Sequence, residues 1–495
     1  MNSMESKNKS FGKNARLALL SAFFVSLALP YIGWSFLVWF ALVPLFFALR
    51  RERSLRFAIL LTLIFGVFYF IAIIAPLFEL NDVWWGGGLG VYHGIFAMLF
   101  LALVTALYGA IFFVPVAYVI HRYRTATMPG IFLAALTWSI FEYIRSHYGL
   151  AGYDGGTLGY ALLSFPYLRE SAYLFGVGGL SFLIVLVNIL LVLVYERMEG
   201  KTFAEIKRVF VELFSSTRDK YWMFLFLFVF LCIIGAGVIR NETNPPYRKT
   251  PLHVGVVVAN SEDQSVGGGL YRAYREKMIM LLRAHPETNI ILFPENTFPF
   301  FAIDENTKML ALEQPVALDD REMLYGDFLS MSKKYSTTTF AIGLHTVNKE
   351  KKYNTLVFYR DGVIIGMLHK ERLVPFFEYV PFGLPIRLFE TLTPGELGQK
   401  IEISGDTMSL LMCSEVSDRS ITPSGVSLIL APSNDSVFTR HMAGSVHDTF
   451  ARMRAIESGA YLVRANRGSV SSIVNPKGEV LKTDFGDTVL FATLY

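Results

Sequence analysis

The stretch "SLLMCSEVSDRS", residues 409–420, places a cysteine where an apolar run opens into polar residues. An apolar run of this length predicts a buried strand that ends near residue 412. A lone cysteine at such a strand end is most often a small buried hydrophobe, and the alternative is a nucleophile. The choice between these two interpretations of Cys413 depends on the residues that the fold brings to it.

The second half of the chain has the pattern of an α/β domain. From about residue 251, short β-branched runs alternate with amphipathic stretches. Helices are expected near 270–285 and 440–458, and the expected strands include "LHVGVVVAN" (252–260), "NIILFPEN" (289–296), "TTFAIGLHTV" (338–347) and "SLILAPSNDS" (427–436). Strands separated by helices predict an α/β sheet with added antiparallel hairpins. In such sheets the ligand site gathers at the carboxyl ends of the strands.

Three reactive side chains share that placement. Glu295 follows "IILFP", Lys370 follows "GMLH" and Cys413 follows "SLLM". A cysteine attacks carbonyls as a thiolate, so it needs a base, and the resulting oxyanion needs a cation or N–H donors. Taken singly, such a glutamate is usually solvated or capping, and such a lysine is usually surface charge. Because the three together supply base, cation and nucleophile, the joint pattern favours a catalytic cysteine.

The first half of the chain has the composition of a membrane protein. Over the whole chain, hydrophobic residues make up 53% and charged residues 17%. Uncharged apolar runs occupy Leu17–Leu49, Phe57–Phe78, Gly94–Ile120, Met128–Phe141, Ser171–Tyr195 and Tyr221–Ile239. As one straight helix the first run would be about 50 Å long, against a hydrocarbon core of roughly 30 Å. The turn "PYIG" at 30–33 therefore predicts two short crossings there, and the runs together predict seven.

Loop charges give an independent test of that count. With a cytoplasmic N-terminus, the loops on the inner side carry sixteen Lys and Arg residues, and the loops on the outer side before residue 240 carry two. This is a strong positive-inside bias. The alternative for the start, a cleaved signal peptide, is disfavoured because no small-x-small cleavage site follows the first apolar stretch.

These patterns set the domain boundaries. We expect a cytoplasmic N-terminus over 1–16 and a transmembrane domain of about seven helices over 17–240. A polar linker over 241–250 contains two consecutive prolines, which end a helix. The α/β domain over 251–495 is then delivered to the outer side of the membrane.

Several kinds of site are disfavoured by composition. The net charge is only +4, and no basic block with interleaved aromatic residues indicates nucleic acid binding. The two cysteines, Cys232 and Cys413, are predicted to lie inside and outside the bilayer, so a disulfide is not expected. His441 and His447 are six residues apart, and no Cys or Asp pattern completes a zinc site with them. We expect neither a metal nor a cofactor.

The motifs around the three reactive residues resemble a known family. "FPEN" with Glu295, "HKERLVPFFEYVP" with Lys370 and "CSE" with Cys413 look like the Glu–Lys–Cys triad of the nitrilase (carbon–nitrogen hydrolase) superfamily. The membrane half joined to it is similar to one branch, the apolipoprotein N-acyltransferases. Further motifs of that branch are matched by "LVPFFE", Asn434 and Asp435, "RAIESGAYLVRAN" (454–466), "FEYIRSHYGLAGYDGGTLGY" (141–160) and "GVGGLSFLIVLVN" (176–188).

The resemblance implies a fold and a reaction. The fold is a multi-pass α-helical membrane domain joined to a periplasmic α/β nitrilase-like domain, an αββα sandwich, in the bacterial inner membrane. Cys413 would take an acyl chain from a phospholipid as a thioester and pass it to the α-amine of a diacylated apolipoprotein. Glu295 would be the general base and acid. Lys370 and the N–H of Ser414 would stabilise the oxyanion, and Glu378 and Glu415 would shape the site.

The chain departs from the family pattern at several points. Ser414 stands where an aromatic residue is usual, and Phe377 stands where a glycine is usual. The family ends with one more transmembrane helix, and no apolar run of about 20 residues follows the α/β domain. Either the N-terminal side alone tethers that domain, or the gene is truncated.

Rival functions follow from the same residues. A membrane-tethered amidase or nitrilase would pass the thioester to water, an acyltransferase could use a different amine, and a transporter or scaffold would need no triad. We expect a monomer whose partners are membrane lipids and the two lipid substrates. Glu142 and Arg145, three residues apart at a predicted helix end, are expected either to bind lipid headgroups or to form a structural ion pair.

Overall fold

The computed structural model describes residues 2–79, 91–123, 128–148, 153–199, 217–242, 250–259, 267–298, 302–304, 318–375, 377–380, 391–438 and 442–495. The chain divides into two compact units. The first contains residues 1–148 and 154–243, and the second contains residues 149–153 and 244–495.

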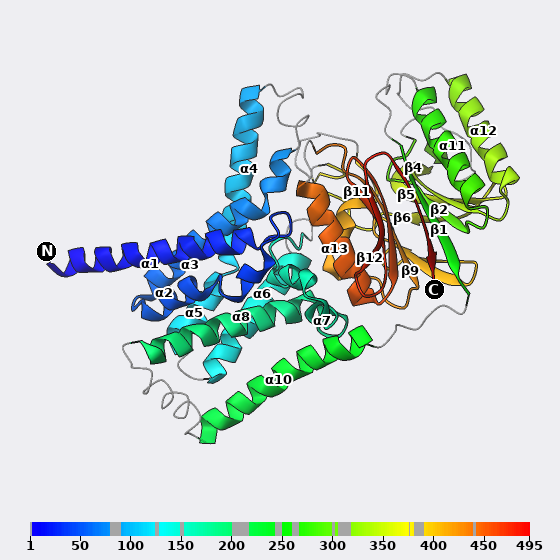
Figure 1. Ribbon diagram of the computed structural model, residues 1–495. Helices are drawn as coiled ribbons and strands as arrows, with labels where there is room; N and C mark the ends of the chain where they lie inside the picture. Colours follow the sequence, from blue (N-terminus) through cyan, green and yellow to red (C-terminus); the bar gives the residue numbers. More distant parts are fainter. Residues whose placement is uncertain are drawn as a thin grey trace. The chain divides into compact units, whose positions relative to one another are not determined.

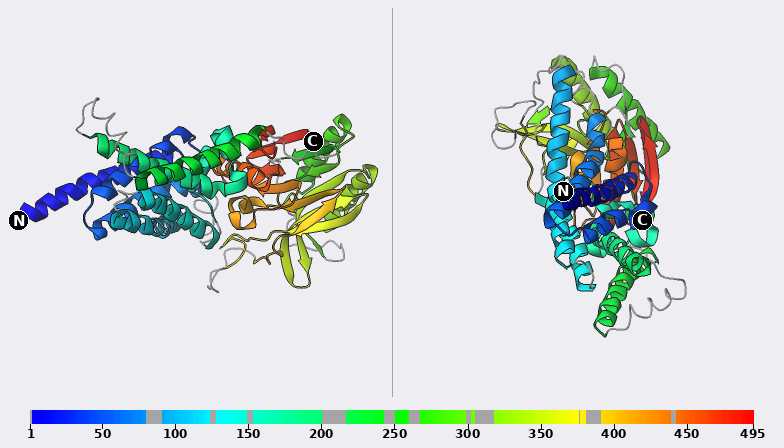
Figure 2. Two further views of the ribbon diagram at one scale, coloured as in Figure 1. Left: turned by 90° about the horizontal axis from the view of Figure 1, so that it is seen from below. Right: turned by 90° about the vertical axis from the view of Figure 1, so that its left-hand side faces the viewer.

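The first unit is helical. Its elements are α1 (Asn2–Leu27), η1 (Ser35–Trp39), α2 (Val43–Arg51), α3 (Leu55–Ile73), η2 (Ala75–Glu79), α4 (Val91–Ile111), α5 (Val114–Tyr123), α6 (Met128–Tyr148), η5 (Leu158–Ser164), α7 (Pro166–Arg169), α8 (Ala172–Met198) and α10 (Thr217–Glu242). The N-terminal part of α1 extends beyond the other helices of the unit (Figure 2). Among the described residues, three stretches are long and apolar enough to cross a membrane: Leu55–Ile73, Ala102–Tyr123 and Ala172–Met198. These three helices fit membrane insertion by their length and composition, and the total of seven crossings stays a prediction.

The expected second crossing, near residues 34–49, is not one continuous helix. It consists of η1 and α2, and α2 has nine residues, a rise of about 14 Å. The break leaves backbone groups without helical partners, and in an apolar environment these must find other partners. Asn188 on α8 supplies two, because its Oδ1 accepts from the N–H of Leu42 at 2.9 Å and its Nδ2 donates to the Val38 carbonyl at 2.9 Å.

The end of α6 holds the loop that follows it. Glu142 and Arg145 are both buried. The Glu142 carboxylate accepts from the N–H of Leu158 at 3.1 Å, and Arg145 donates to the Gly155 carbonyl at 2.7 Å. Asp154 accepts from the Tyr160 hydroxyl at 2.6 Å in the same loop. The two α6 side chains therefore have a structural role in which they order residues 154–158.

The second unit contains two mixed sheets. The first has the order β13-β1-β2-β4-β5-β6, with β3 beside β4, and the second has the order β12-β11-β10-β9-β8-β7. The strands are β1 (Leu252–Val258), β2 (Ile290–Leu292), β3 (Ala302–Asp304), β4 (Thr339–Asn348), β5 (Lys351–Arg360), β6 (Val363–His369), β7 (Lys400–Ile403), β8 (Asp406–Leu410), β9 (Leu428–Asn434), β10 (Tyr461–Arg467), β11 (Val470–Val474), β12 (Val480–Phe485) and β13 (Thr488–Leu494).

Parallel pairs form the centre of each sheet, and antiparallel hairpins extend them. In the first sheet β1, β2 and β4 are parallel, and in the second β8, β9 and β10 are parallel. The pairs β4–β5, β5–β6 and β10–β11 are antiparallel. This arrangement confirms the predicted α/β sheet with added hairpins.

The two sheets pack face to face between helical layers. One core cluster joins apolar side chains of both sheets, among them Val256 and Leu292 from the first and Leu430 and Val463 from the second. A second cluster joins the first sheet to the helices α11 (Gly267–Ala284) and α12 (Leu318–Lys334). The helix α13 (Met442–Ser458) contacts β10 and β11 on the other side (Figure 1). The layers are thus α, β, β, α, as the resemblance implied.

Candidate active site

Glu295 lies in a tight turn after β2. The turn packs directly on β4, because a Cβ added to Gly343 would lie 2.5 Å from the Pro294 carbonyl oxygen and 2.8 Å from the Glu295 Cα. The N–H of Thr297 donates to the Gly343 carbonyl at 2.9 Å. Asn296 has φ +49°, a left-handed conformation that is uncommon outside glycine. These contacts fix the backbone that carries the Glu295 carboxylate, and its side chain is mostly buried.

Lys370 follows β6 and is 1% exposed. Its Nζ donates to Glu378 Oε1 at 2.9 Å and lies 3.6 Å from Glu295 Oε1. Burial lowers the pKa of Lys370, but the carboxylates of Glu378 and Glu295 outweigh it and raise the pKa above the ordinary value. The lysine is therefore a buried ammonium held between two carboxylates.

Cys413 begins the short helix η7 (Cys413–Ser417), three residues beyond Leu410, where β8 ends. Its φ of +54° is strained for a residue with a Cβ. Burial raises the pKa of the Cys413 thiol well above its ordinary value, and the Glu295 carboxylate raises it further, while Lys370 lowers it. The resting group is therefore a thiol, and a base must take its proton before it can attack a carbonyl.

Glu415 connects the cysteine turn to the segment after Lys370. Its Oε1 accepts from the backbone N–H groups of Glu371 at 2.7 Å and Arg372 at 2.8 Å. Its Oε2 accepts from the N–H of Met412 at 2.6 Å. Burial raises the pKa of Glu415 to about 8, although Lys370 and these three N–H groups act to lower it. The side chain fixes the distance between the turns that carry the nucleophile and the cation.

Glu378 and Asn354 complete the polar cluster. Glu378 Oε2 accepts from the N–H of Val374 at 2.7 Å, which closes the loop after Lys370. Asn354 on β5 is 3% exposed, and its Nδ2 donates to Glu295 Oε1 at 2.7 Å and to Glu378 Oε1 at 3.3 Å. Asn354 was not among the site residues expected from the sequence. The only signal was an asparagine inside the apolar and aromatic run "YNTLVFY".

The residues predicted for the site thus occupy one region of the second unit. Glu295, Lys370 and Glu378 are in direct contact, and Cys413 interacts electrostatically with all three. Ser414 follows Cys413 in η7, where its carbonyl accepts from the Ser417 hydroxyl at 2.7 Å. The arrangement can supply a thiol, a carboxylate to deprotonate it and a cation for an oxyanion. The individual catalytic roles stay predictions.

The histidines considered for a metal have other positions. His447 lies 3.0 Å from Asp435 through its Nδ1, and His441 is outside the described residues. Within the part of the chain that the structure describes, no group of three or more His, Cys, Asp or Glu side chains could hold a metal ion.

Comparison with known proteins gives two domain matches. Residues 21–190 match the apolipoprotein N-acyltransferase N-terminal domain, and residues 273–494 match the carbon–nitrogen hydrolase domain. Together the two matches cover most of both structural units.

Curated relatives are similar to most of the chain. An apolipoprotein N-acyltransferase of Geobacter metallireducens is 25% identical over 489 residues, which cover 94% of this chain and 85% of the relative. One of Aquifex aeolicus is 26% identical, with 70% of this chain and 72% of the relative covered. Among solved structures, a carbon–nitrogen hydrolase of Helicobacter pylori aligns with 49% of this chain and 89% of its own, at 19% identity and a TM-score of 0.37.

Proposed function

The chain belongs to the apolipoprotein N-acyltransferases, the membrane branch of the carbon–nitrogen hydrolases, and on that premise we propose its reaction and the residues that perform it. The enzyme transfers an acyl chain from a phospholipid to the α-amine of the diacylglyceryl-modified N-terminal cysteine of an apolipoprotein. The observation that carries the assignment of residues is the cluster of Glu295, Lys370 and Cys413 inside the carbon–nitrogen hydrolase domain.

In the first half-reaction the acyl chain moves to the enzyme. Cys413 Sγ attacks the carbonyl carbon of a phospholipid ester while the Glu295 carboxylate takes the thiol proton. The Lys370 ammonium and the N–H of Ser414 stabilise the oxyanion. When the ester C–O bond breaks, Glu295 returns the proton to the oxygen of the departing lysophospholipid. A thioester on Cys413 remains.

In the second half-reaction the neutral α-amine of the acceptor attacks the thioester carbonyl. Glu295 takes a proton from the attacking nitrogen, and the C–S bond breaks. The proton then passes to the Cys413 sulfur, which restores the thiol. The raised pKa of this thiol supports the scheme, because each half-reaction needs a base that exchanges a proton with sulfur.

Glu378 and Glu415 are proposed to act through the backbone and through Lys370. Glu378 holds the Lys370 ammonium at 2.9 Å, so it directs the cation toward the oxyanion. Glu415 binds the N–H groups of Glu371 and Met412, so it holds the two turns in register. Neither carboxylate needs to exchange a proton with substrate.

The proposed location is the bacterial inner membrane, crossed by about seven helices, with residues 251–495 in the periplasm. The bias of sixteen Lys and Arg residues against two supports this orientation. Both substrates are lipid-anchored, and withdrawing an acyl chain into water costs about 0.8 kcal/mol per CH₂. A nucleophile on the outer side of the membrane can reach lipids of the outer leaflet without that cost.

The acyl-enzyme tests this proposal. Purified enzyme in phospholipid vesicles, without acceptor, is expected to gain the mass of one acyl chain on the peptide that contains Cys413. Hydroxylamine should remove it, because thioesters are cleaved by this nucleophile. Cys413→Ala should gain no acyl group. An acyl group on another residue of the wild-type enzyme, or no acyl group on the wild-type enzyme at all, would contradict the mechanism. Release of free fatty acid without transfer to an amine would favour the rival hydrolase.

A further inference from the structure

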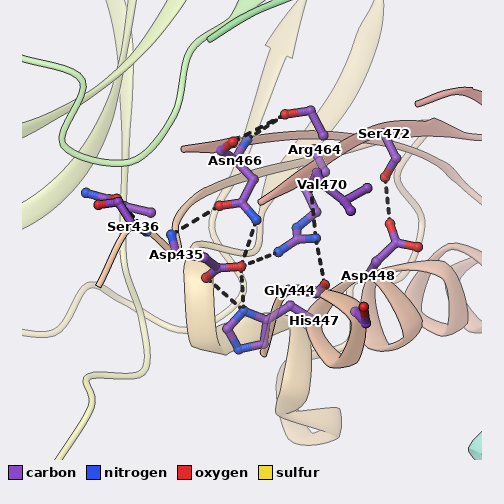
Figure 3. A network of polar contacts seen from close by, with 12 residues as sticks. Asp435, Ser436, Gly444, His447, Asp448, Arg464, Asn466, Val470 and Ser472 are labelled. Atoms are coloured by element: carbon purple, nitrogen blue, oxygen red, sulfur yellow. Dashed lines mark hydrogen bonds and ion pairs between the residues drawn. The ribbon is translucent and has the colours of Figure 1, made fainter. Parts of the chain in front are cut away.

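A buried polar network surrounds Asp435, directly after β9 (Figure 3). Asp435 is 1% exposed. Its Oδ2 accepts from Arg464 Nη2 at 3.0 Å and from Asn466 Nδ2 at 2.7 Å, both on β10. Its Oδ1 lies 3.0 Å from the Nδ1 of His447 on α13. The carboxylate thus joins the ends of β9 and β10 to the helix that covers them.

The backbone of Asp435 is tied to the end of β10 as well. Its N–H lies 2.8 Å from the Arg467 carbonyl and 3.1 Å from Asn466 Oδ1. Gly468, the residue directly after β10, has φ +84°, and a Cβ there would lie 2.5 Å from the Cα of Ser436. The turn after β10 is therefore pressed against the backbone after Asp435. This packing sets the position of Arg467.

Arg467 in turn holds the backbone next to Glu295. Its Nη2 donates to the carbonyl oxygens of Asn296 at 2.9 Å and Thr297 at 3.2 Å. These carbonyls belong to the turn that carries the proposed general base, and that turn is part of the other sheet. A continuous chain of contacts therefore runs from the Asp435 carboxylate through the end of β10 to Glu295.

Asp435 also lies at the same sheet edge as the nucleophile. β8 and β9 are adjacent parallel strands, and Cys413 and Asp435 belong to the segments that follow their carboxyl ends. Burial raises the pKa of Asp435, but His447 and Arg464 outweigh it and lower the pKa below the ordinary value, so the carboxylate is ionised. This negative charge adds to those that raise the pKa of the Cys413 thiol.

We propose that Asp435 is a positioning residue for the acyl transfer, which aligns the Glu295 turn with the Cys413 turn through the strand end that carries Asn466 and Arg467. The inference rests on the proposed function. Its effect on transfer is geometric, through the Arg467 contacts, and its effect on the thiol is electrostatic. A purely structural aspartate, one that only stabilises the fold, would have neither effect in a variant that remains folded.

The test measures two properties of the full-length enzyme in detergent. The first is the rate of Cys413 alkylation by iodoacetamide as a function of pH, in a Cys232→Ser background. The second is acyl transfer from phospholipid to a diacylated peptide. The variants below leave unchanged the charged groups around the thiol that lie on other residues. These are Glu295 after β2, Lys370 and Glu378 after β6, and Glu415 in η7, whose pKa is raised to about 8.

Asp435→Asn removes one negative charge near the thiol, so the alkylation midpoint should move to lower pH by roughly 0.5–1 unit. Acyl transfer should fall about tenfold or more, since small displacements of catalytic groups cost rates of this order. The matched control is Asp448→Asn, one residue after His447 on α13, whose carboxylate binds the Ser472 hydroxyl at 2.9 Å. It should change neither property.

Arg467→Gln is the second variant. It keeps the proposal testable if the Asp435→Asn protein does not fold. It keeps the carboxylate and its three partners but loses the contacts to Asn296 and Thr297. Transfer should fall about tenfold while the alkylation midpoint stays at the wild-type pH. Wild-type transfer in folded Arg467→Gln would overturn the proposal, as would an unshifted alkylation midpoint in folded Asp435→Asn. Alkylation of Cys413 does not involve the acyl acceptor. If the proposed function were wrong, the wild-type enzyme would fail in the transfer assay, and the alkylation assay could still be read.

Discussion

At the scale of single residues, the sequence located Cys413, Glu295 and Lys370 because their chemistry is unusual at the ends of apolar strands. The structure shows why the thiol needs a base beside it. The Cys413 thiol is buried, and burial opposes its ionisation. Asn354 could not be found in the same way. An asparagine in a strand has no distinctive pattern, and it meets Glu295 only because β5 pairs with β6 so that residues 354 and 370 lie side by side.

Cys413→Ser should lose at least about a hundredfold in acyl transfer and remain folded. A serine hydroxyl is far harder to ionise than a thiol, and the same burial that raises the thiol pKa opposes the alkoxide still more. Steady-state transfer to a diacylated peptide measures the loss, and thermal unfolding monitors the fold. Transfer within threefold of the wild type would mean that Cys413 is not the nucleophile.

At the scale of elements, strand register and turn geometry decide where the reactive groups meet. Short β-branched runs separated by amphipathic stretches were enough to predict the central strands and the presence of hairpins, but not the short strands β3 and β7. It was not enough to predict the close approach of β4 to the Glu295 turn, because this depends on a missing side chain at Gly343. Likewise, the break between η1 and α2 was not predicted, since a continuous apolar run contains no sign of the Asn188 side chain that stabilises it.

Gly343→Ala should displace the Glu295 turn, because the added Cβ would lie within 3 Å of three backbone atoms of residues 294–296. We expect a loss of about 1–3 kcal/mol in unfolding free energy and at least about tenfold in acyl transfer. Denaturant unfolding and the transfer assay measure the two effects.

Gly326→Ala is the matched control for this prediction. Gly326 lies in α12, and a Cβ there would meet nothing within 4 Å. Because alanine is the better helix former, the control should be neutral or gain up to about 1 kcal/mol. Equal losses of unfolding free energy and acyl transfer in the two variants would show that the close contact of Gly343 with the Glu295 turn is not needed for stability or transfer.

At the scale of the whole molecule, the chain has two units with different properties. One is helical and apolar, and the other contains the candidate active site. Composition indicates where the apolar part of the chain ends, since the uncharged runs end before residue 240. The order of the layers in the second unit came from resemblance, because periodicity alone does not distinguish one sheet covered on both faces from two stacked sheets. The described helices include three candidate membrane spans, which do not by themselves give an orientation. The proposed orientation therefore depends on the loop charges.

The orientation can be measured with single cysteines in a chain that lacks Cys232 and Cys413. A membrane-impermeant maleimide applied to intact spheroplasts should label Thr250→Cys, after the last helix, and should spare Ser54→Cys until the membrane is permeabilised. The reason is the excess of Lys and Arg in the loops assigned to the inner side. Labelling of position 54 with protection of position 250 would reverse the proposed topology.

The mass of a lipoprotein N-terminus shows most directly whether the enzyme acylates the α-amine through Cys413. A diacylated lipopeptide is incubated in phospholipid vesicles with the wild-type enzyme or with Cys413→Ala, and the products are analysed by mass spectrometry. We expect that the wild type adds one acyl chain to the α-amine and that Cys413→Ala adds none. N-acylation by Cys413→Ala, or phospholipid deacylation by the wild type with an unmodified lipopeptide, would contradict this expectation.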